Sequence, residues 1–241
     1  MTPKDLVLEA VAAIFINFDA SAAEQLLAKD YIQHNPAVPT GAAPILGFIP
    51  GLQESGIKVD IHRVIAEGDM VVLHTTYENA EAFGADTLVG FDVFRVEDGK
   101  VAEHWDNLTP ITPPNPSGHS QTDGLIDITD LDKTAENKAL VTDFVETILK
   151  GGEVDRITDF LSTKTYIQHN SQIADGLDGL GAALAAMAEQ GIEMVYTDVH
   201  IVVAEGSFVF TASQGTLGGT PTAFYDLFRV EDGKIVEHWD V

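Results

Sequence analysis

The chain has 241 residues, no cysteine, and a formal net charge of −25, from 38 Asp and Glu against 13 Lys and Arg. So large an acidic excess repels phosphate backbones and anionic lipid surfaces, which argues against nucleic-acid and membrane partners. The absence of cysteine excludes disulfides, thiol nucleophiles and thiolate metal sites. The composition is that of a globular protein with no apolar run of membrane-spanning length, and the amino-terminal stretch lacks the basic leader of a signal peptide, so we expect a cytoplasmic location.

Three helices are predicted in the first half of the chain. The first begins with Thr2 as N-cap and Pro3 at the first helical position, and its apolar residues recur at helical spacing. Ser21 followed by Glu24 has the spacing of a capping box and predicts a second, short helix that ends before residue 31. A third helix is predicted over about residues 42–54.

Four strands are predicted after the third helix. Tight turns at AEGD and VEDGK separate runs rich in β-branched and aromatic residues, at 57–66, 70–79, 86–97 and 100–108. Three helices followed by an antiparallel meander predict an α+β unit, with the helices packed on one face of a curved sheet.

The second half of the chain repeats the first. YIQHN at 31–35 returns at 166–170, and FDVFRVEDGKVAEHWD at 91–106 returns as YDLFRVEDGKIVEHWD at 225–240, with 12 of 16 positions identical. An offset of about 135 residues is the length of a domain, so the pattern indicates a tandem duplication. We predict a first domain over 1–110, a linker rich in Pro, Gly, Ser and Asp over 111–132, and a second domain over 133–241, with helices at 133–150, 153–162 and 177–190 and strands from 192 onward.

These two motifs, YIQHNP and FRVEDGK followed by EHWD, resemble the SnoaL-like polyketide cyclase family of the NTF2-like superfamily, and both halves carry them. The resemblance implies two cone-shaped α+β barrels in tandem, each with a deep pocket between helices and sheet, and no cofactor. It also implies dimerisation through the sheets, and a small-molecule substrate. In the cyclases of that family an aspartate of the last strands acts as acid and base on a carbon next to carbonyl groups, helped by histidines.

The end of the last predicted strand carries the candidate catalytic residues. Because side chains alternate along a strand, His104 and Asp106 share one face, as do His238 and Asp240 in the second copy. Burial raises the pKa of a carboxyl group while a neighbouring imidazolium lowers it, and such a balance places a base near neutral pH. The alternative is that the HWD motif only closes the sheet. The neighbouring strand and the YIQHN segment, expected as a loop at the mouth of the cone, add the candidate substrate-binding residues: Asp92, Phe94, Tyr31, Gln33 and His34, with Asp226, Phe228, Tyr166, Gln168 and His169 as their counterparts.

His74 is a further catalytic candidate, and it distinguishes the copies because Ala212 takes its place in the second. His34, His74, His104 and Asp106 would suit a zinc or iron ion if they converged, but no close metal-binding spacing occurs, and no metal is expected. His119, in the predicted linker, is assigned no role.

The predicted function is cofactor-independent acid/base chemistry on a small carbonyl compound, an aldol-type cyclisation or an isomerisation. In that scheme Asp106 moves the proton, His104 sets its ionisation, and Gln33, His34 and His74 bind the developing oxyanion. The alternatives are non-catalytic binding of a small hydrophobic ligand, or a module that serves association alone. The duplication predicts an internal pseudo-dimer of the two domains and leaves a further homo-oligomer open.

Overall fold

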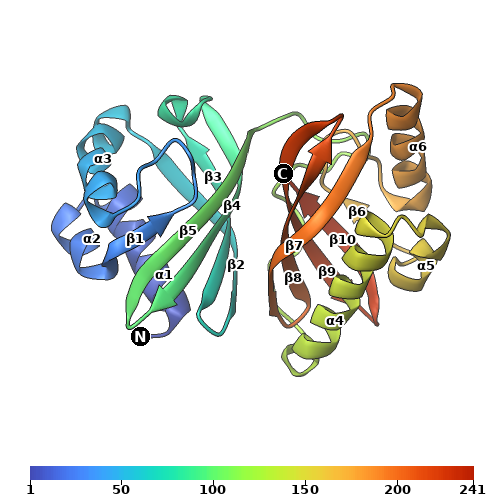
Figure 1. Cartoon of the computed structure of the whole chain (residues 1–241), viewed down its shortest axis with the longest axis horizontal. Coiled ribbons are helices and arrows are strands. Elements are labelled where there is room, and N and C mark those ends of the chain that lie inside the picture. Colours follow the sequence, from blue (N-terminus) through green and yellow to red (C-terminus); the bar gives the residue numbers. More distant parts are fainter. The chain divides into compact units, whose positions relative to one another are not determined.

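The computed structural model describes residues 1–241 and divides the chain into two compact units, Met1–Ile111 and Thr112–Val241. Each unit is built from helices lying on one face of a five-stranded sheet, so the expected α+β class is confirmed for both (Figure 1). None of the helices combines the length and apolar character that crossing a bilayer requires.

The first unit contains three helices and five strands. The helices are α1 (Pro3–Val11), which continues as a π-helical turn (Ala12–Ile16), α2 (Ala20–Leu26) and α3 (Ala42–Ser55). The strands are β1 (Leu27–Gln33), β2 (Lys58–Glu67), β3 (Met70–Glu78), β4 (Thr87–Glu97) and β5 (Lys100–Pro110), with a short 3₁₀ turn (Glu81–Phe83) before β4. Their order in the sheet is β1-β5-β4-β3-β2, in which β1 alone runs parallel to its neighbour.

The second unit repeats this order. Its helices are α4 (Thr134–Phe144), prolonged by a π-helical turn (Val145–Lys150), α5 (Ile157–Phe160) and α6 (Gly176–Glu189), with 3₁₀ turns at Leu131–Lys133 and Val154–Arg156. Its strands are β6 (Ile167–Gln168), β7 (Met194–Glu205), β8 (Phe208–Leu217), β9 (Thr220–Glu231) and β10 (Lys234–Asp240), in the sheet order β6-β10-β9-β8-β7. Here too the short first strand pairs in parallel with the last, β6 with β10.

Two caps start the first two helices, and one of them differs from the prediction. Thr2 caps α1 as expected, accepting from Asp5 N while the Asp5 carboxylate accepts from Thr2 N. The cap of α2 is Asp19, whose side chain accepts from Ala22 N at 3.0 Å. Ser21 already lies inside the first turn, so the capping box predicted for it is wrong. An extended backbone at Asp19 lets its short carboxylate reach the free amides of that turn.

Replacing Asp19 by Ala should therefore destabilise the first unit by about 1 kcal/mol, the usual cost of losing an N-cap side chain. Ser21→Ala is the matched control and should change the free energy of unfolding by less than about 0.5 kcal/mol, as surface substitutions do. Urea unfolding of the two variants measures both values. Equal losses would contradict the assignment of the cap.

Alternation along the strands gives each sheet a helix-facing side and an outer side. In the first unit Leu73, Tyr77 and Phe94 join one buried cluster with the helix residues Leu6 and Ile49, which identifies their side as the helix-facing one. In the second unit a corresponding cluster combines residues of α4 with Val209 and Phe228 of the sheet.

The segment YIQHN does not form the predicted loop. It enters β1, where Gln33 pairs with His104 of β5, and in the second unit Gln168 pairs with His238. The polar run around Lys29 and Asp30 breaks the apolar alternation that would have marked an edge strand in the sequence.

The segment predicted as a linker belongs to the second unit rather than standing between units. Asn115 Nδ2 donates to the carbonyl oxygens of Gln168 at 2.6 Å and Ile173 at 3.0 Å. Farther along, Ser207 N donates to Thr129 O at 2.7 Å. Sequence composition indicated a linker between domains here, but specific hydrogen bonds attach the segment to the second unit.

Candidate functional site

Parallel pairing of β1 with β5 brings the two repeated motifs together. His34 N donates to His104 O at 3.0 Å, and the Gln33–His104 register places both of these side chains on the helix-facing side. Side chains alternate, so Asn35 follows Gln33 to that side while His34 points to the outer side. The duplicated YIQHN and EHWD motifs are thus two halves of one arrangement.

His104 is held between a carboxylate and an amide. Its Nε2 donates to Asp92 Oδ1 at 3.1 Å, and its Nδ1 lies 3.1 Å from Gln33 Nε2, which donates to it. The Phe94 ring stacks on the imidazole at a centroid distance of 4.5 Å. The imidazole ring therefore has a fixed orientation among buried groups.

Asp92 is anchored by three donors. Thr75 Oγ1 donates to its Oδ2 at 2.8 Å and the Tyr77 hydroxyl at 2.9 Å, while His104 takes the other oxygen. Asp92 is 4% exposed, so these hydrogen bonds replace the water that the carboxylate loses on burial. Burial and the nearby Asp92 charge raise the pKa of Tyr77, which keeps its hydroxyl protonated as a donor.

Asp106 lies opposite Asp92 in the β4–β5 register and is held differently. Asn35 Nδ2 donates to both of its oxygens, at 2.8 and 3.0 Å. Burial raises the pKa of Asp106, the Asp92 charge adds to that rise, and His104 and Asn35 oppose it. The carboxylate of Asp106 is therefore a stronger base than that of an ordinary aspartate.

Tyr31 completes the cluster from the start of the motif. It is 4% exposed and belongs to the helix-facing core. Burial, together with the charges of Asp92 and Asp106, raises its pKa far above the usual value. Its hydroxyl remains a hydrogen-bond donor at any physiological pH.

The second unit repeats this cluster with closely similar geometry. His238 Nε2 donates to Asp226 Oδ1 at 3.0 Å, Gln168 Nε2 lies 3.2 Å from His238 Nδ1, and Asn170 Nδ2 donates to both oxygens of Asp240 at 3.0 Å. Phe228 stacks on His238 at 4.6 Å. Burial opposes the charged form of His238, but the hydrogen bond to Asp226 and the Asp240 charge outweigh it and raise the pKa.

The pKa values of the carboxyl and phenol groups in the second cluster are raised, like those in the first cluster. Burial raises the pKa of Asp240, against the opposing charge of His238. Burial likewise raises the pKa of Tyr166, the counterpart of Tyr31, with contributions from Asp240 and Asp226. The two clusters thus share one electrostatic design.

The tyrosine that donates to Asp92 in the first unit and to Asp226 in the second comes from different strands in the two units. Gly215 occupies the position of Tyr77, and its register partner Tyr196 on β7 donates to Asp226 at 3.2 Å instead. A Cβ at Gly215 would collide with the Val195 carbonyl, so the strands approach too closely there for a side chain. A second difference is that the buried hydroxyls of Thr211 and Ser213, on the same side as Asp226, have no hydrogen-bond partner.

Three predicted site residues lie on the outer side, away from the clusters. His34 stacks on Trp105 at 4.6 Å with its Nε2 2.7 Å from Glu103 Oε1, and His169 stacks on Trp239 at 4.5 Å with its Nε2 2.9 Å from Glu237 Oε1. Both were expected beside Gln33 and Gln168, but successive strand residues face opposite ways.

His74 is the third, and it lies beside Thr75 in sequence but on the other side of β3. Arg63 Nη1 is 3.1 Å from its Nδ1, and Phe91 stacks on its ring at 4.6 Å. Its expected contact with the oxyanion is therefore not supported. The four residues weighed as metal ligands, His34, His74, His104 and Asp106, do not converge, in line with the expectation that they form no metal site.

Residues that the sequence analysis left out complete the clusters. Asn35 donates to Asp106 and Asn170 to Asp240. Thr75 and Tyr77 donate to Asp92, and Tyr196 donates to Asp226. The two-residue spacing from Gln33 to Asn35 was the available signal, since it puts both amides on one face of a strand.

Two groups of possible metal ligands coincide with the clusters: Asp92, His104 and Asp106 in the first unit, and Asp226, His238 and Asp240 in the second. Each offers one imidazole and two carboxylates on the helix-facing side. In both groups, however, the imidazole Nε2 is directed at Asp92 or Asp226. The other carboxylate, that of Asp106 or Asp240, accepts from an asparagine.

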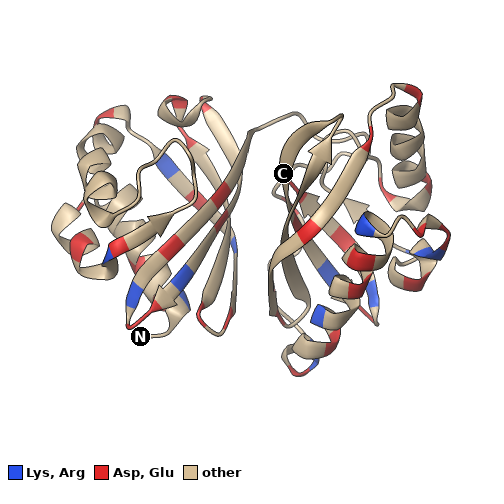
Figure 2. Ribbon diagram, in the orientation of Figure 1, with Lys and Arg blue, Asp and Glu red and all other residues tan.

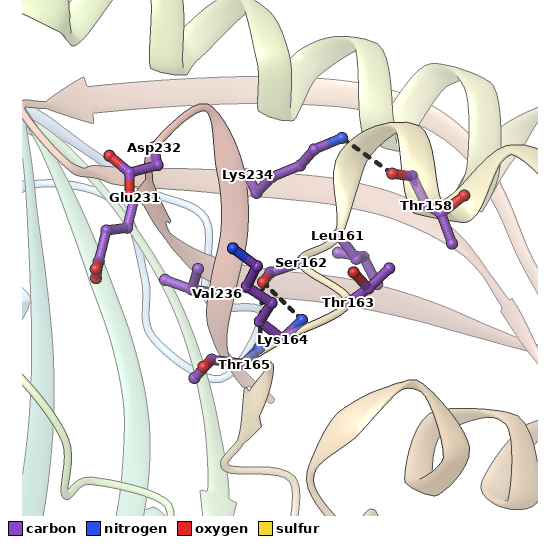
Figure 3. A pocket seen from close by; sticks show the side chains of 10 residues that line it. All are labelled: Thr158, Leu161, Ser162, Thr163, Lys164, Thr165, Glu231, Asp232, Lys234 and Val236. Carbon is purple, nitrogen blue, oxygen red and sulfur yellow. Dashed lines mark hydrogen bonds between the residues drawn. The ribbon is translucent and has the colours of Figure 1, made fainter.

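A separate groove of about 390 Å³ lies in the second unit, between the α5–β6 connection and the β9–β10 turn (Figure 3). Leu161, Ser162, Lys164, Lys234 and Val236 are among its lining residues, and Lys234 Nζ donates to Thr158 O at 2.9 Å. It contains none of the predicted site residues. Over the whole chain 38 acidic residues stand against 13 basic ones, and the acidic residues are spread over helices and strands of both units (Figure 2).

Comparisons with known proteins place both units in one group. The model of the SnoaL-like domain matches residues 8–104 and again 141–238. A search among curated proteins finds no match.

Solved structures resemble one unit at a time. TsrD from Streptomyces laurentii is 23% identical over 43% of this chain and 85% of its own, with a TM-score of 0.37. An NTF2-like protein from Cytophaga hutchinsonii is 21% identical over 46% and 92%, with a TM-score of 0.38. An LEH-like epoxide hydrolase from M. tuberculosis is 20% identical over 44% and 82%, with a TM-score of 0.37.

Proposed function

Because this chain belongs to the SnoaL-like domain family, we propose that each helix-facing cluster binds a small carbonyl compound. We further propose that the first cluster moves a proton on that compound without a cofactor, in an aldol-type cyclisation or an isomerisation. One observation carries the proposal: Asp106, with a raised pKa, lies opposite Asp92, which is hydrogen-bonded to His104, on the helix-facing side.

Each group has a role that follows from its contacts. Asp106 takes the proton from the carbon next to the carbonyl group, because burial makes its carboxylate a stronger base than usual. Asp92, fixed by Thr75 and Tyr77, orients His104. The developing enolate oxygen would accept from the Tyr31 hydroxyl, which stays protonated at neutral pH.

Proton exchange in D₂O tests the proposal even though the natural substrate is unknown. We expect the wild-type chain to speed the incorporation of deuterium at the acidic carbon of at least one member of a panel of β-dicarbonyl compounds, followed by proton NMR. Glu103→Gln is the matched control, since Glu103 precedes His104 on the same strand but contacts His34 and Arg95 on the outer side. Exchange no faster than in buffer across the panel would contradict the proposal.

Binding without turnover is the second candidate, and one observation favours it for the second unit. Thr211 and Ser213 present buried hydroxyls without partners beside Asp226, and buried polar groups of this kind usually meet water or a polar ligand atom. A compound that shifts the NMR signals of the second unit but exchanges no protons there would assign it to binding.

The duplication supports a further proposal on assembly, namely that the two units act as an internal pseudo-dimer in place of a homodimer. A monomeric mass of 25.9 kDa by light scattering is then expected. An obligate symmetric dimer that buries the same faces would contradict it.

A further inference from the structure

We propose that the second unit binds a divalent transition-metal ion, with zinc as the representative case, through His119, Asp123 and His169 on its outer side. One donor atom of each residue lies within 4.8 Å of a donor atom of the other two. The site is separate from the helix-facing clusters, since His169 points away from Gln168 and Asn170.

The carboxylate of Asp123 lies between the two imidazoles. His169 Nδ1 is 2.8 Å from Asp123 Oδ1, and His119 Nδ1 is 3.5 Å from Asp123 Oδ2. His169 Nδ1 also lies 2.8 Å from the carbonyl oxygen of Ser120, and a bound ion would replace this hydrogen bond. Ligand atoms around a tetrahedral zinc ion at about 2.0–2.1 Å lie roughly 3.3 Å apart. The two distances to Asp123 are close to this value, and the two imidazole donors lie within 4.8 Å of each other, so the side chains would close in on the ion when it binds. Two nitrogens and one oxygen leave the fourth position to water, and imidazole donors favour zinc over calcium or magnesium.

The far side of each imidazole is already arranged as in metal centres. His169 Nε2 donates to Glu237 Oε1 at 2.9 Å, and His119 Nε2 donates to Asp175 Oδ2 at 3.2 Å. Metal-binding histidines usually donate their other ring N–H to a carboxylate, which fixes the tautomer and strengthens the donor nitrogen. Glu237 is itself held by Arg229 Nε at 2.6 Å.

The backbone that carries His119 and Asp123 is held in place before any ion arrives. Asn115 Oδ1 accepts from His119 N at 3.0 Å, and Trp239 Nε1 donates to Asp123 O at 3.0 Å. Gly124, at φ +95°, passes so close to the sheet that a Cβ would collide with the Glu237 carboxylate and the Trp239 ring. Preorganised ligands lower the cost of binding.

Exposure provides a path of entry. The His169 side chain is fully buried, but the side chains of His119 and Asp123 are 31% and 45% exposed. An ion can therefore reach two ligands from solvent and then meet the third. In this role the ion would fasten residues 112–130 over the His169–Trp239 pair.

The first unit serves as an internal comparison. It has the same outer group, with His34 stacked on Trp105 and hydrogen-bonded to Glu103, but no metal-binding group forms around His34. The histidine of this motif thus has further metal-binding side chains beside it only in the second unit, where residues 112–130 supply them.

Equilibrium dialysis of the full chain against Zn²⁺, followed by metal analysis, tests the site. We expect one tightly held ion per chain and, at a hundredfold excess over the dissociation constant, a rise in Tm of about 5 °C or more. His119→Ala and Asp123→Asn should each weaken zinc binding by at least about 100-fold, and Asp175→Asn by about 10–100-fold. Co²⁺ bound at the site should give the visible absorption of a four-coordinate ion.

Two controls make the result decisive. His34→Ala, at the matching position of the first unit, should leave the zinc affinity unchanged. The double variant Asp106→Asn with Asp240→Asn, which removes a carboxylate from each helix-facing group, should retain the ion. Zinc that stays in His119→Ala but leaves the double variant would overturn the proposal, as would a chain that retains no zinc at micromolar concentrations.

Discussion

Replacing Asp106 by Asn should lower the rate of proton abstraction by about 10²–10⁴-fold, the contribution of a positioned general base. Asparagine keeps the shape of the side chain and an oxygen that can accept from Asn35, so the cluster should stay folded. The loss should appear in kcat more than in KM, because a base acts in the transition state. Steady-state deuterium exchange measures both constants.

The same substitution should alter how stability depends on pH. Burial raises the pKa of Asp106 above its usual 3.8, so the folded chain keeps this proton at pH values where the unfolded chain has lost it. The stability from this group is fully present below the unfolded pKa and is lost as pH rises through the folded pKa. At neutral pH Asp106→Asn should therefore be at least as stable as the wild type, with the advantage shrinking toward acid.

Asp240→Asn provides the comparison for the second cluster, where burial raises the pKa of the matching carboxyl group. If the first unit carries the chemistry, this variant should keep most of the activity. A wild-type rate in Asp106→Asn, together with a loss in Asp240→Asn, would transfer the catalytic role to the second unit.

Trp239→Ala should cost about 3–5 kcal/mol in the free energy of unfolding of the second unit, the range for removing a buried aromatic side chain. Trp239 is 1% exposed, stacks on His169, packs at 6.0 Å from Phe208, and donates to Asp123 O. Its removal opens a cavity and also releases the segment that crosses it. Chemical denaturation monitored by far-UV circular dichroism gives the change.

Trp105→Ala is the control at the same position of the first unit. Trp105 stacks on His34, a side chain that is 41% exposed, and residues 112–130 belong to the second unit. A smaller loss is expected there. Equal losses in both variants would show that the segment adds nothing to the stability of the second unit.

The helices and the four-stranded meander could be predicted because hydrophobic periodicity and turn residues are local signals. The first strand could not, because β1 is short, polar in its middle, and pairs with a strand some 70 residues away. Because this strand was not predicted, YIQHN was expected to form a loop. That error placed His34 with Gln33 rather than on the opposite face.

The face that a site residue occupies could be predicted where alternation along one strand determines it. It could not be predicted where it depends on pairing with a neighbouring strand. His104 and Asp106 lie together as alternation required. The side of His74 depended on the register of β3 with β4, in which His74 pairs with Phe91 and Leu73 with Asp92. The replacement of Tyr77 by Tyr196 depended on the close approach of the strands at Gly215. Neither can be read from a single segment.

Parallel closure of each sheet by its first and last strands also bears on the order of events during folding. Gln33 and His104 meet across 71 residues, and Gln168 and His238 across 70, so the loop closed by each pair spans more than half of its unit. Contacts at such sequence separation form late, because the entropy of loop closure precedes any gain. On the ribosome, a nascent first unit would form its helices and hairpins before β1 pairs with β5, and its helix-facing cluster would assemble only in the final step.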